Sequence, residues 1–301
     1  MGLSGKTKNF KYLDDLIHSG VGKIVLDFDV ALFEGEEAKY FEGIELDVCD
    51  VVIDAAGHTI DGCGKVRIFN CISRNITIIN AVVKNGFSEE SGGAICNTGE
   101  LVVENCVFSN NNAFCGGAIG NSNKLKITRS LFSGNVVKGK KSAGGAIYND
   151  NGRLDMESSK LLGNLSNWGG AISSEDSLVN VSGCVLSGNC ARDGGGAIYV
   201  ETGDLSIQEF SLSGNTSNLD GGAIWNQSAN IRICGSYVTS NKSRHSGGAI
   251  SSYDGKLEIA NSLFSSNYAE SGGNAIFINS KDDLILKNCS ISEGDISFNG
   301  F

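Results

Sequence analysis

Pairs of carboxylates are the residues of this sequence that most readily suggest chemistry. They are Asp27 with Asp29, Asp54 with Asp61, and Asp193 with Asp220. Two carboxylates held close together can act as general acid and base in the cleavage of polysaccharides, often beside a bound Ca²⁺. Asp54 and Asp61 flank a predicted turn that contains His58, and carboxylates in such turns usually bond to nearby backbone N–H groups. We therefore expect a structural role for this pair.

Histidine and cysteine give little indication of a metal or redox site. The three histidines lie in unrelated sequence contexts, at His18, His58 and His245. The ten cysteines include no Cys-x-x-Cys pair, which zinc and redox sites commonly use. One recurring position is expected to face inward as a small core residue, and it holds Cys106, Cys184 and Cys289. The sequence predicts neither a bound metal nor another cofactor.

The elements that must position these residues come from a repeat. The string Gly-Gly-Ala-Ile occurs seven times at intervals of 24 to 28 residues, with its isoleucine at Ile95, Ile119, Ile147, Ile172, Ile198, Ile224 and Ile250. An interrupted copy, Gly-Gly-Asn-Ala-Ile, ends at Ile276. A second motif, apolar-x-x-Asn, precedes every copy and ends at Asn85, Asn111, Asn135, Asn164, Asn189, Asn215, Asn241 and Asn267. Two motifs in constant phase indicate a solenoid built from one repeated unit.

Short alternating segments between the motifs predict strands. Residues 101–103, 125–127 and 205–207 have apolar side chains at every second position, and no repeat shows a helical period. About three short strands per repeat fit one coil of a right-handed parallel β-helix, stacked about 4.8 Å from the next coil. We therefore predict an all-β solenoid of about ten coils.

Each motif has a structural role in such a coil. The alanine and isoleucine are expected to form inward apolar ladders, and the glycine pair to allow a bend or a close approach of backbone. The motif asparagines favour left-handed turns and can bond to neighbouring backbone. We expect all eight, from Asn85 to Asn267, to form a buried structural ladder rather than a ligand site.

The chain before the repeats predicts a cap. One face of a short helix, which Gly20 could end, would hold Phe10, Leu13, Leu16 and Ile17. A helix there would cover the open end of the first coil. We expect residues 1–43 to form this cap and the first strands, and residues 44–301 to form the repeats, continuing or capped beyond residue 301.

Composition and charge exclude several classes of protein. The 301 residues include 41 glycines and no proline, with 41% hydrophobic and 19% charged residues, which argues against a collagen and against a disordered chain. The net charge of −10 disfavours nucleic acid and anionic lipid as main partners, since both bind basic surfaces. No stretch approaches the roughly 20 apolar residues of a membrane span, and the charged first residues are not typical of a signal peptide.

The alternation of Gly-Gly-Ala-Ile with Phe-x-x-Asn resembles the chlamydial polymorphic outer-membrane proteins. The segment from Ile53 to Gly62, with residues 67–70 and 75–78 after it, is more similar to the adhesin-like surface proteins of methanogenic archaea. The likeness covers residues 24–290. It implies a pectate-lyase-like parallel β-helix, a location at the cell surface or outside the cell, and an adhesive role without catalysis.

The segments between the motif asparagine and the glycine pair vary from copy to copy. Because the coils stack in register, these segments line one edge of the rod, where solenoids commonly build recognition surfaces. The expected partner is a glycan, or a protein on a host or neighbouring cell, and the alternative is that the loops are merely solvated. The candidate ligand-binding residues form a mixed aromatic and charged strip of Trp168, Arg192, Asp193, Asp220 and His245.

Lysines gather in the longest repeat, at Lys138, Lys140 and Lys141. A run of like charge is usually a solvated face, so we expect a solvated insertion here. Contact with an acidic glycan is the alternative.

Three hypotheses for function follow. We favour a non-catalytic, adhesin-like interaction module. A polysaccharide lyase or glycoside hydrolase of the parallel β-helix class is the second hypothesis, but we expect no column of carboxylates across three or more adjacent coils, which a Ca²⁺-assisted lyase would show. A structural stalk is the third.

Overall fold

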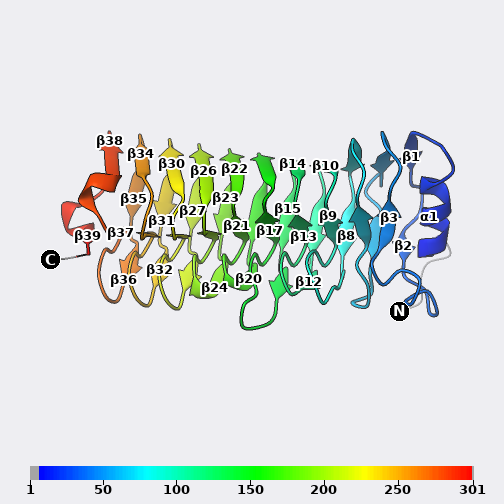
Figure 1. Cartoon of the computed structure of the whole chain (residues 1–301), viewed down its shortest axis with the longest axis horizontal. Helices are drawn as coiled ribbons and strands as arrows, with labels where there is room; N and C mark the ends of the chain where they lie inside the picture. The colour runs from blue at the N-terminus through cyan, green and yellow to red at the C-terminus, as the bar shows by residue number, and fades with distance from the viewer. Residues whose placement is uncertain (1–6, 300–301) are drawn as a thin grey trace.

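The computed structural model describes residues 7–299 and shows a rod of stacked coils. The coils follow one another in chain order, from the helix α1 (Phe10–Ile17) at the N-terminal end to the last strands at the other end (Figure 1). Every strand pair described is parallel, and the strands form four sheets. The predicted all-parallel β-solenoid of about ten coils is confirmed.

Each sheet takes one strand from successive coils, and the chain visits sheets I, II, III and IV in turn. Sheet I contains β1 (Lys23–Val25), β4 (Val52–Asp54), β7 (Ile76–Ile79), β10 (Glu100–Glu104), β14 (Lys124–Thr128), β18 (Arg153–Glu157), β22 (Ser177–Ser182), β26 (Gly203–Gln208), β30 (Asn230–Cys234), β34 (Leu257–Ala260) and β38 (Leu284–Lys287). Sheet II contains β2 (Val30–Ala31), β5 (Thr59–Asp61), β8 (Val82–Lys84), β11 (Val107–Ser109), β15 (Leu131–Ser133), β19 (Lys160–Leu162), β23 (Val185–Ser187), β27 (Ser211–Ser213), β31 (Tyr237–Thr239) and β35 (Leu263–Ser265).

The other two sheets differ in where they begin. Sheet III contains β12 (Asn112–Ala113), β16 (Val136–Val137), β20 (Leu165–Trp168), β24 (Cys190–Gly194), β28 (Thr216–Ser217), β32 (Lys242–Ser243) and β36 (Tyr268–Ala269). Sheet IV contains β3 (Ile44–Leu46), β6 (Phe69–Cys71), β9 (Ile95–Asn97), β13 (Ile119–Asn121), β17 (Ile147–Asp150), β21 (Ile172–Glu175), β25 (Ile198–Val200), β29 (Ile224–Asn226), β33 (Ile250–Ser252), β37 (Ile276–Ile278) and β39 (Ile296–Phe298). Sheet III therefore starts several coils later than the others.

The motif residues form the core and the corners of each coil. The isoleucines of Gly-Gly-Ala-Ile are fully buried and pair in register along sheet IV, as Ile172 does with Ile198. The alanine carbonyl of each coil accepts from the preceding coil, with Ala171 N at 2.8 Å from Ala197 O. Phe108 and Phe132 stack inside the rod with ring centroids 4.8 Å apart. Alternating side chains thus fill a narrow interior, while backbone N–H and C=O groups bond to one another between coils.

Seven of the eight motif asparagines form one continuous ladder, which is buried except at the half-buried Asn267. From Asn135 through to Asn267, each side-chain oxygen accepts from the backbone and the side chain of the asparagine in the preceding coil, at 2.9–3.1 Å. Asn85 is not part of this ladder, so that prediction was wrong. The buried residue of β8 is Val83 rather than Val82, and in-register pairing places Gly86 beside Asn111 while Asn85 bonds to Asp61.

Helix α1 covers the N-terminal end of the coils. Phe10, Leu13 and Ile17 are buried, and Asn9 caps the helix by accepting from Tyr12 N. The helix contacts β2 and β3, so its apolar face closes the first coil as the sequence predicted. Two short 3₁₀ helices, η1 (Lys281–Asp283) and η2 (Glu293–Asp295), lie near the other end. No helix in residues 7–299 is long and apolar enough to cross a membrane.

Candidate functional site

Three of the five predicted ligand-binding residues lie along one corner of the rod, where sheet III turns into sheet IV. Trp168, Gly194 and Asp220 pair in register across successive coils, and Ser246 continues the same column. His245 directly precedes Ser246. The glycine pair makes the turn at this corner, so side chains from the ends of sheet III meet the outer face of sheet IV.

Aromatic rings pack together at this corner. Trp168 lies with its ring centroid 5.3 Å from that of Tyr199 and 4.6 Å from that of Trp225. Tyr253 and Phe277 extend the group along the rod, with centroid separations of 5.9 and 6.2 Å. We call these five residues the corner cluster. A Cβ atom at Gly194 would lie 2.0 Å from Cε3 of Trp225, so only glycine leaves room for this indole.

Four members of the corner cluster are not among the residues predicted from the sequence. Tyr199, Trp225 and Phe277 occupy the position directly after the motif isoleucine, and Tyr253 lies three residues after it. That first position points outward from sheet IV because the isoleucine points inward. The phase of the repeat therefore identifies these aromatic residues as outward-facing, whereas the variable loops do not contain them.

Asp220 connects the corner cluster to His245. Its Oδ1 accepts from Ser246 N at 3.0 Å and lies 2.7 Å from His245 Nδ1, and Tyr253 Oη donates to Oδ2 at 3.1 Å. The Asp220 side chain is 9% exposed, whereas that of His245 is 55% exposed. Burial and the nearby Asp220 raise the pKa of Tyr253 to about 12, so its hydroxyl stays a donor. The carboxylate thus holds the exposed imidazole of His245 and the half-buried phenol of Tyr253.

Arg192 and Asp193 lie on β24 just before Gly194. Arg192 is exposed and Asp193 is half-buried. Neither side chain bonds or forms an ion pair with another residue between 7 and 299; only the backbone carbonyl of Asp193 accepts, from Ser217 Oγ. The structure thus places them beside the corner without fixing their side chains in the network of Trp168, Asp220 and His245.

A column of carboxylates runs beside the corner cluster, contrary to the sequence analysis. Asp150 pairs with Glu175 between β17 and β21, and Glu201 N donates to Ser174 O at 2.9 Å in the next coil. Each is the third residue after the motif isoleucine, so the regularity is present in the sequence. The prediction that no such column exists was wrong. We call these three residues the acidic column.

The acidic column is joined to tyrosines. Tyr148 Oη donates to Glu175 at 2.9 Å. Burial and the charge of Glu175 raise the pKa of Glu201. Even so, within residues 7–299 no three His, Cys, Asp or Glu side chains are grouped so that they could hold a metal ion.

The side chains of Asp54 and Asp61 lie on different sheets and do not bond to each other. Asp54 ends β4 in sheet I and bonds to Ala56 N and Asn80 Nδ2, whereas Asp61 ends β5 in sheet II and bonds to Cys63 N and Asn85 Nδ2. His58 contacts Asp29 instead of either carboxylate, with its Nδ1 3.2 Å from Oδ1. Both carboxylates therefore bond locally.

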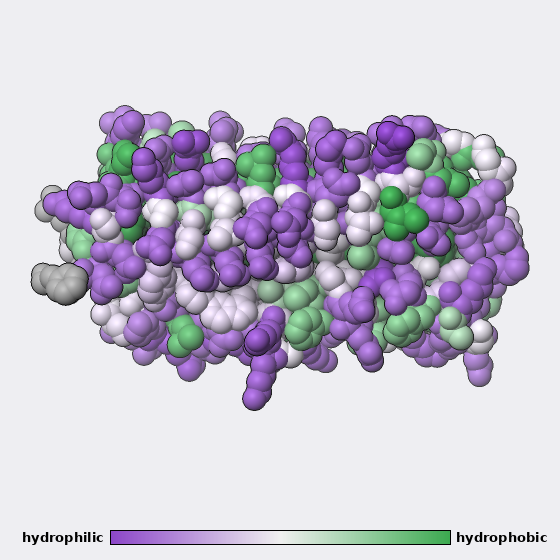
Figure 2. All heavy atoms as spheres, viewed as in Figure 1, coloured by the Kyte–Doolittle hydropathy of each residue, from purple (hydrophilic) through white to green (hydrophobic). Residues whose placement is uncertain are grey.

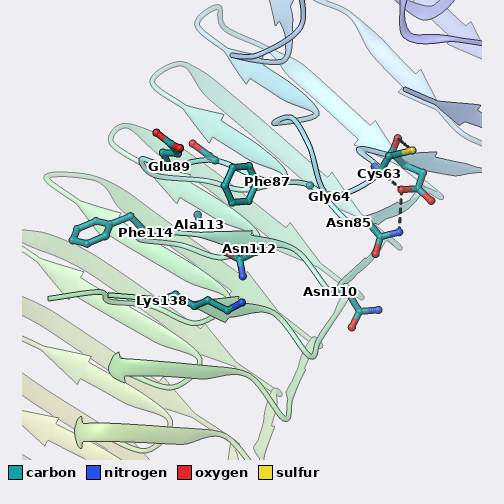
Figure 3. A pocket seen from close by; sticks show the side chains of 13 residues that line it. Cys63, Gly64, Asn85, Phe87, Glu89, Asn110, Asn112, Ala113, Phe114 and Lys138 are labelled. Atoms are coloured by element: carbon teal, nitrogen blue, oxygen red, sulfur yellow. Dashed lines mark hydrogen bonds between the residues drawn. The ribbon is translucent and has the colours of Figure 1, made fainter. Parts of the chain in front are cut away.

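A groove of about 680 Å³ opens on another part of the rod, where sheet III begins (Figure 3). We call it the sheet III groove. Its lining includes Phe87, Asn112, Phe114 and Lys138, and further residues from the coil before. On the face of the rod shown in Figure 2 the surface is mostly hydrophilic, and hydrophobic residues appear only as separate patches.

Comparison with known proteins bears on the repeat. The model of the Chlamydia polymorphic membrane protein repeat matches residues 129–150, 183–201 and 209–227. Each segment runs from a strand of sheet II through the motif asparagine and the glycine pair to a strand of sheet IV.

These repeats are similar to the chlamydial ones. The match confirms the predicted resemblance to the chlamydial polymorphic membrane proteins, and two matched segments contain the cluster residues Tyr199 and Trp225. No curated protein and no solved structure matches the chain significantly. The resemblance to archaeal adhesin-like proteins stays a prediction.

Proposed function

We propose that this chain is a surface-displayed, adhesin-like module that binds a glycan at the corner cluster without changing it chemically. The chlamydial repeat and the parallel solenoid fit a surface adhesin-like role. The observation that carries the choice of site is the corner cluster itself, five aromatic residues in contact on consecutive coils.

The chemistry of the corner suits a polyhydroxylated ligand. Trp and Tyr offer apolar ring faces together with polar tips, which is why they are enriched in binding sites. Glu175, Glu201 and His245 flank the rings with hydrogen-bonding groups that remain partly exposed. Because coils stack about 4.8 Å apart, a chain-like ligand lying along the axis would meet several of them.

A glycan array with the purified chain tests this proposal. Replacing Trp225 or Trp168 by alanine is expected to weaken binding to the selected glycan about tenfold, since aromatic anchors dominate binding energy. Tyr237→Ala is the matched control, because this aromatic is 61% exposed on β31 in sheet II, outside the cluster. Binding that survives both tryptophan changes would place the site elsewhere, and binding to proteins but to no glycan would change the ligand class.

Hydrolysis of a polysaccharide is a second candidate, favoured by the acidic column. Glu175 ends β21 and Glu201 directly follows the adjacent β25, and two neighbouring carboxylates of which one has a raised pKa resemble the acid and base of glycoside hydrolases. Release of reducing sugar from a panel of polysaccharides, lost in both Glu175→Gln and Glu201→Gln, would establish it. Asp54→Ala and Asp61→Ala serve as controls, and absence of release supports the binding role.

A further inference from the structure

The sheet III groove exists because sheet III starts late. The coil that contains β8 (Val82–Lys84) has no strand of this sheet, and residues 87–90 lie along β12 in its place. Ser88 N bonds to Asn112 O and Phe114 N bonds to Glu90 O, so the backbone of β12 is already satisfied. What remains open is the space among side chains, and its volume of about 680 Å³ is within the usual range for ligand sites.

Two phenylalanine rings provide apolar walls. Phe87 is half-buried near the middle of the groove, and Phe114 is 42% exposed at its edge (Figure 3). A Cβ at Gly139 would lie 2.9 Å from Cε2 of Phe114, so the ring rests against the backbone of the loop that follows β16. The rings are held in position but keep exposed surface.

Several polar side chains that line the groove bond to no other described residue. The amide of Asn112, the ammonium of Lys138 and the carboxylate of Glu89 make no hydrogen bond or ion pair with any other described residue. Asp61 and Asn85, by contrast, bond to each other at 2.9 Å. In Figure 3 the amide of Asn112 and the ammonium of Lys138 end on the same side of the groove, below Phe87, while Glu89 lies above it.

We propose that the sheet III groove binds an acidic sugar, a pyranose that carries a carboxylate. The carboxylate would pair with Lys138 and accept from the Asn112 amide, and the sugar ring would pack on Phe87 and Phe114. Glu89, on the opposite side, would accept from hydroxyl groups and set the orientation of the ligand. The exposed Lys140 and Lys141 add positive charge to this part of a chain whose net charge is −10.

This site is independent of the corner cluster, since the two share no residue. Calorimetric titration with a hyaluronan tetrasaccharide, which carries glucuronate, and with its methyl ester tests the proposal. The acid is expected to bind at least tenfold more tightly than the ester, and binding should weaken as salt is raised because the interaction is ionic. Equal binding of acid and ester, or no binding of either, would overturn the proposal.

Variants locate the binding. Lys138→Ala is expected to weaken binding of the acid at least tenfold and to leave the ester unchanged, whereas Phe114→Ala weakens both. Lys160→Ala, an exposed lysine on β19 outside the lining, is the matched control, and melting curves check that Phe114→Ala folds. Loss of binding in Trp225→Ala rather than in Lys138→Ala would assign the acidic sugar to the corner cluster and refute the groove, whatever the outcome of the glycan array.

Discussion

At the scale of single residues, Asn189 shows how much of this fold one amide maintains. Its Oδ1 accepts from the backbone and the side chain of Asn164, and its Nδ2 donates to Leu161 O and to Asn215, all at 3.0 Å. The residue is fully buried. No water can replace these bonds, so the amide links three coils.

Asn189→Ala is therefore expected to lower the free energy of unfolding by about 3 kcal/mol, because it leaves several buried donors and an acceptor unpaired. Urea unfolding followed by tryptophan fluorescence measures the change. Asn218→Ala, at an exposed amide with no partner among the described residues, is the control and should cost less than about 0.5 kcal/mol. A similar loss in both variants would contradict the role of the ladder.

Single residues also show where the sequence was sufficient. The asparagine ladder follows from spacing, because one residue per coil at constant phase must stack. The prediction that Asn85 joins the ladder was wrong because Val82 and Val83 are both apolar, and only packing decides which of the two points inward. Trp168 ends β20, whereas Tyr199 and Trp225 lie on β25 and β29 of the next two coils. Spacing alone does not give the turn that brings these three rings together.

At the scale of elements, the glycine pair decides how closely coils can approach. A Cβ at Gly196 would lie 2.0 Å from Gly222 O of the next coil, inside van der Waals contact with backbone. Gly188 has a positive φ of 64°, but nothing lies within 4 Å of a Cβ built there. A substitution at Gly196 therefore tests steric exclusion by the next coil, whereas one at Gly188 tests only the cost of a left-handed backbone conformation.

Gly196→Ala is expected to destabilise the chain by about 3 kcal/mol or more, since the backbone of two coils must move apart. Gly188→Ala should cost only about 1 kcal/mol, the strain of a left-handed conformation offset by lower entropy of the unfolded chain. Thermal unfolding of both variants measures the difference. Equal melting temperatures would show that the coils adjust without cost.

The capping helix depends on charge. His18 Nδ1 lies 2.8 Å from Asp14 O and Nε2 lies 2.8 Å from Asp47 Oδ1, and these bonds raise the pKa of His18 against the effect of burial. A raised pKa in the folded state means that the stabilisation is fully present below about pH 6.5 and is lost as pH rises through the folded value. The end of helix α1 is thus tied to the first coils most firmly in mild acid.

Hydrogen exchange of residues 10–17, corrected for intrinsic rates, is expected to show lower protection at pH 8.5 than at about pH 6. The variant His18→Gln should show the lower protection at both pH values, because glutamine does not titrate. The same decrease in protection in wild type and variant would rule out His18 as its cause.

At the scale of the whole molecule, the fold is a rod in which each strand pairs only with strands of the neighbouring coils. The groove exists because sheet III starts later than the other sheets. This late start could not be inferred from the sequence, because β12 is only two residues long and shows no alternation of apolar and polar residues. The parallel solenoid itself could be inferred, since Gly-Gly-Ala-Ile and the asparagines recur in phase. The repeated residues therefore predict the architecture, whereas surface features such as the groove arise where the coils differ from one another.

Removal of the chain up to Gly20 is expected to cause self-association, because it uncovers the apolar end of the first coil beneath Phe10, Leu13 and Ile17. Light scattering during gel filtration, at equal concentrations of truncated and full chains, measures the mass. Lys11→Ala, on the exposed side of the helix, is the control. A truncated chain with the same mass as the full one would show that the cap is dispensable.

The last five motif isoleucines, from Ile172 to Ile276, are spaced by 26 residues each. Recombination between such copies in the gene could add or excise one entire unit without shifting the inward and outward positions of any other. Each surviving strand would find an equivalent neighbour. The reach of the molecule could thus lengthen or shorten over generations by whole steps, while its cross-section stays the same.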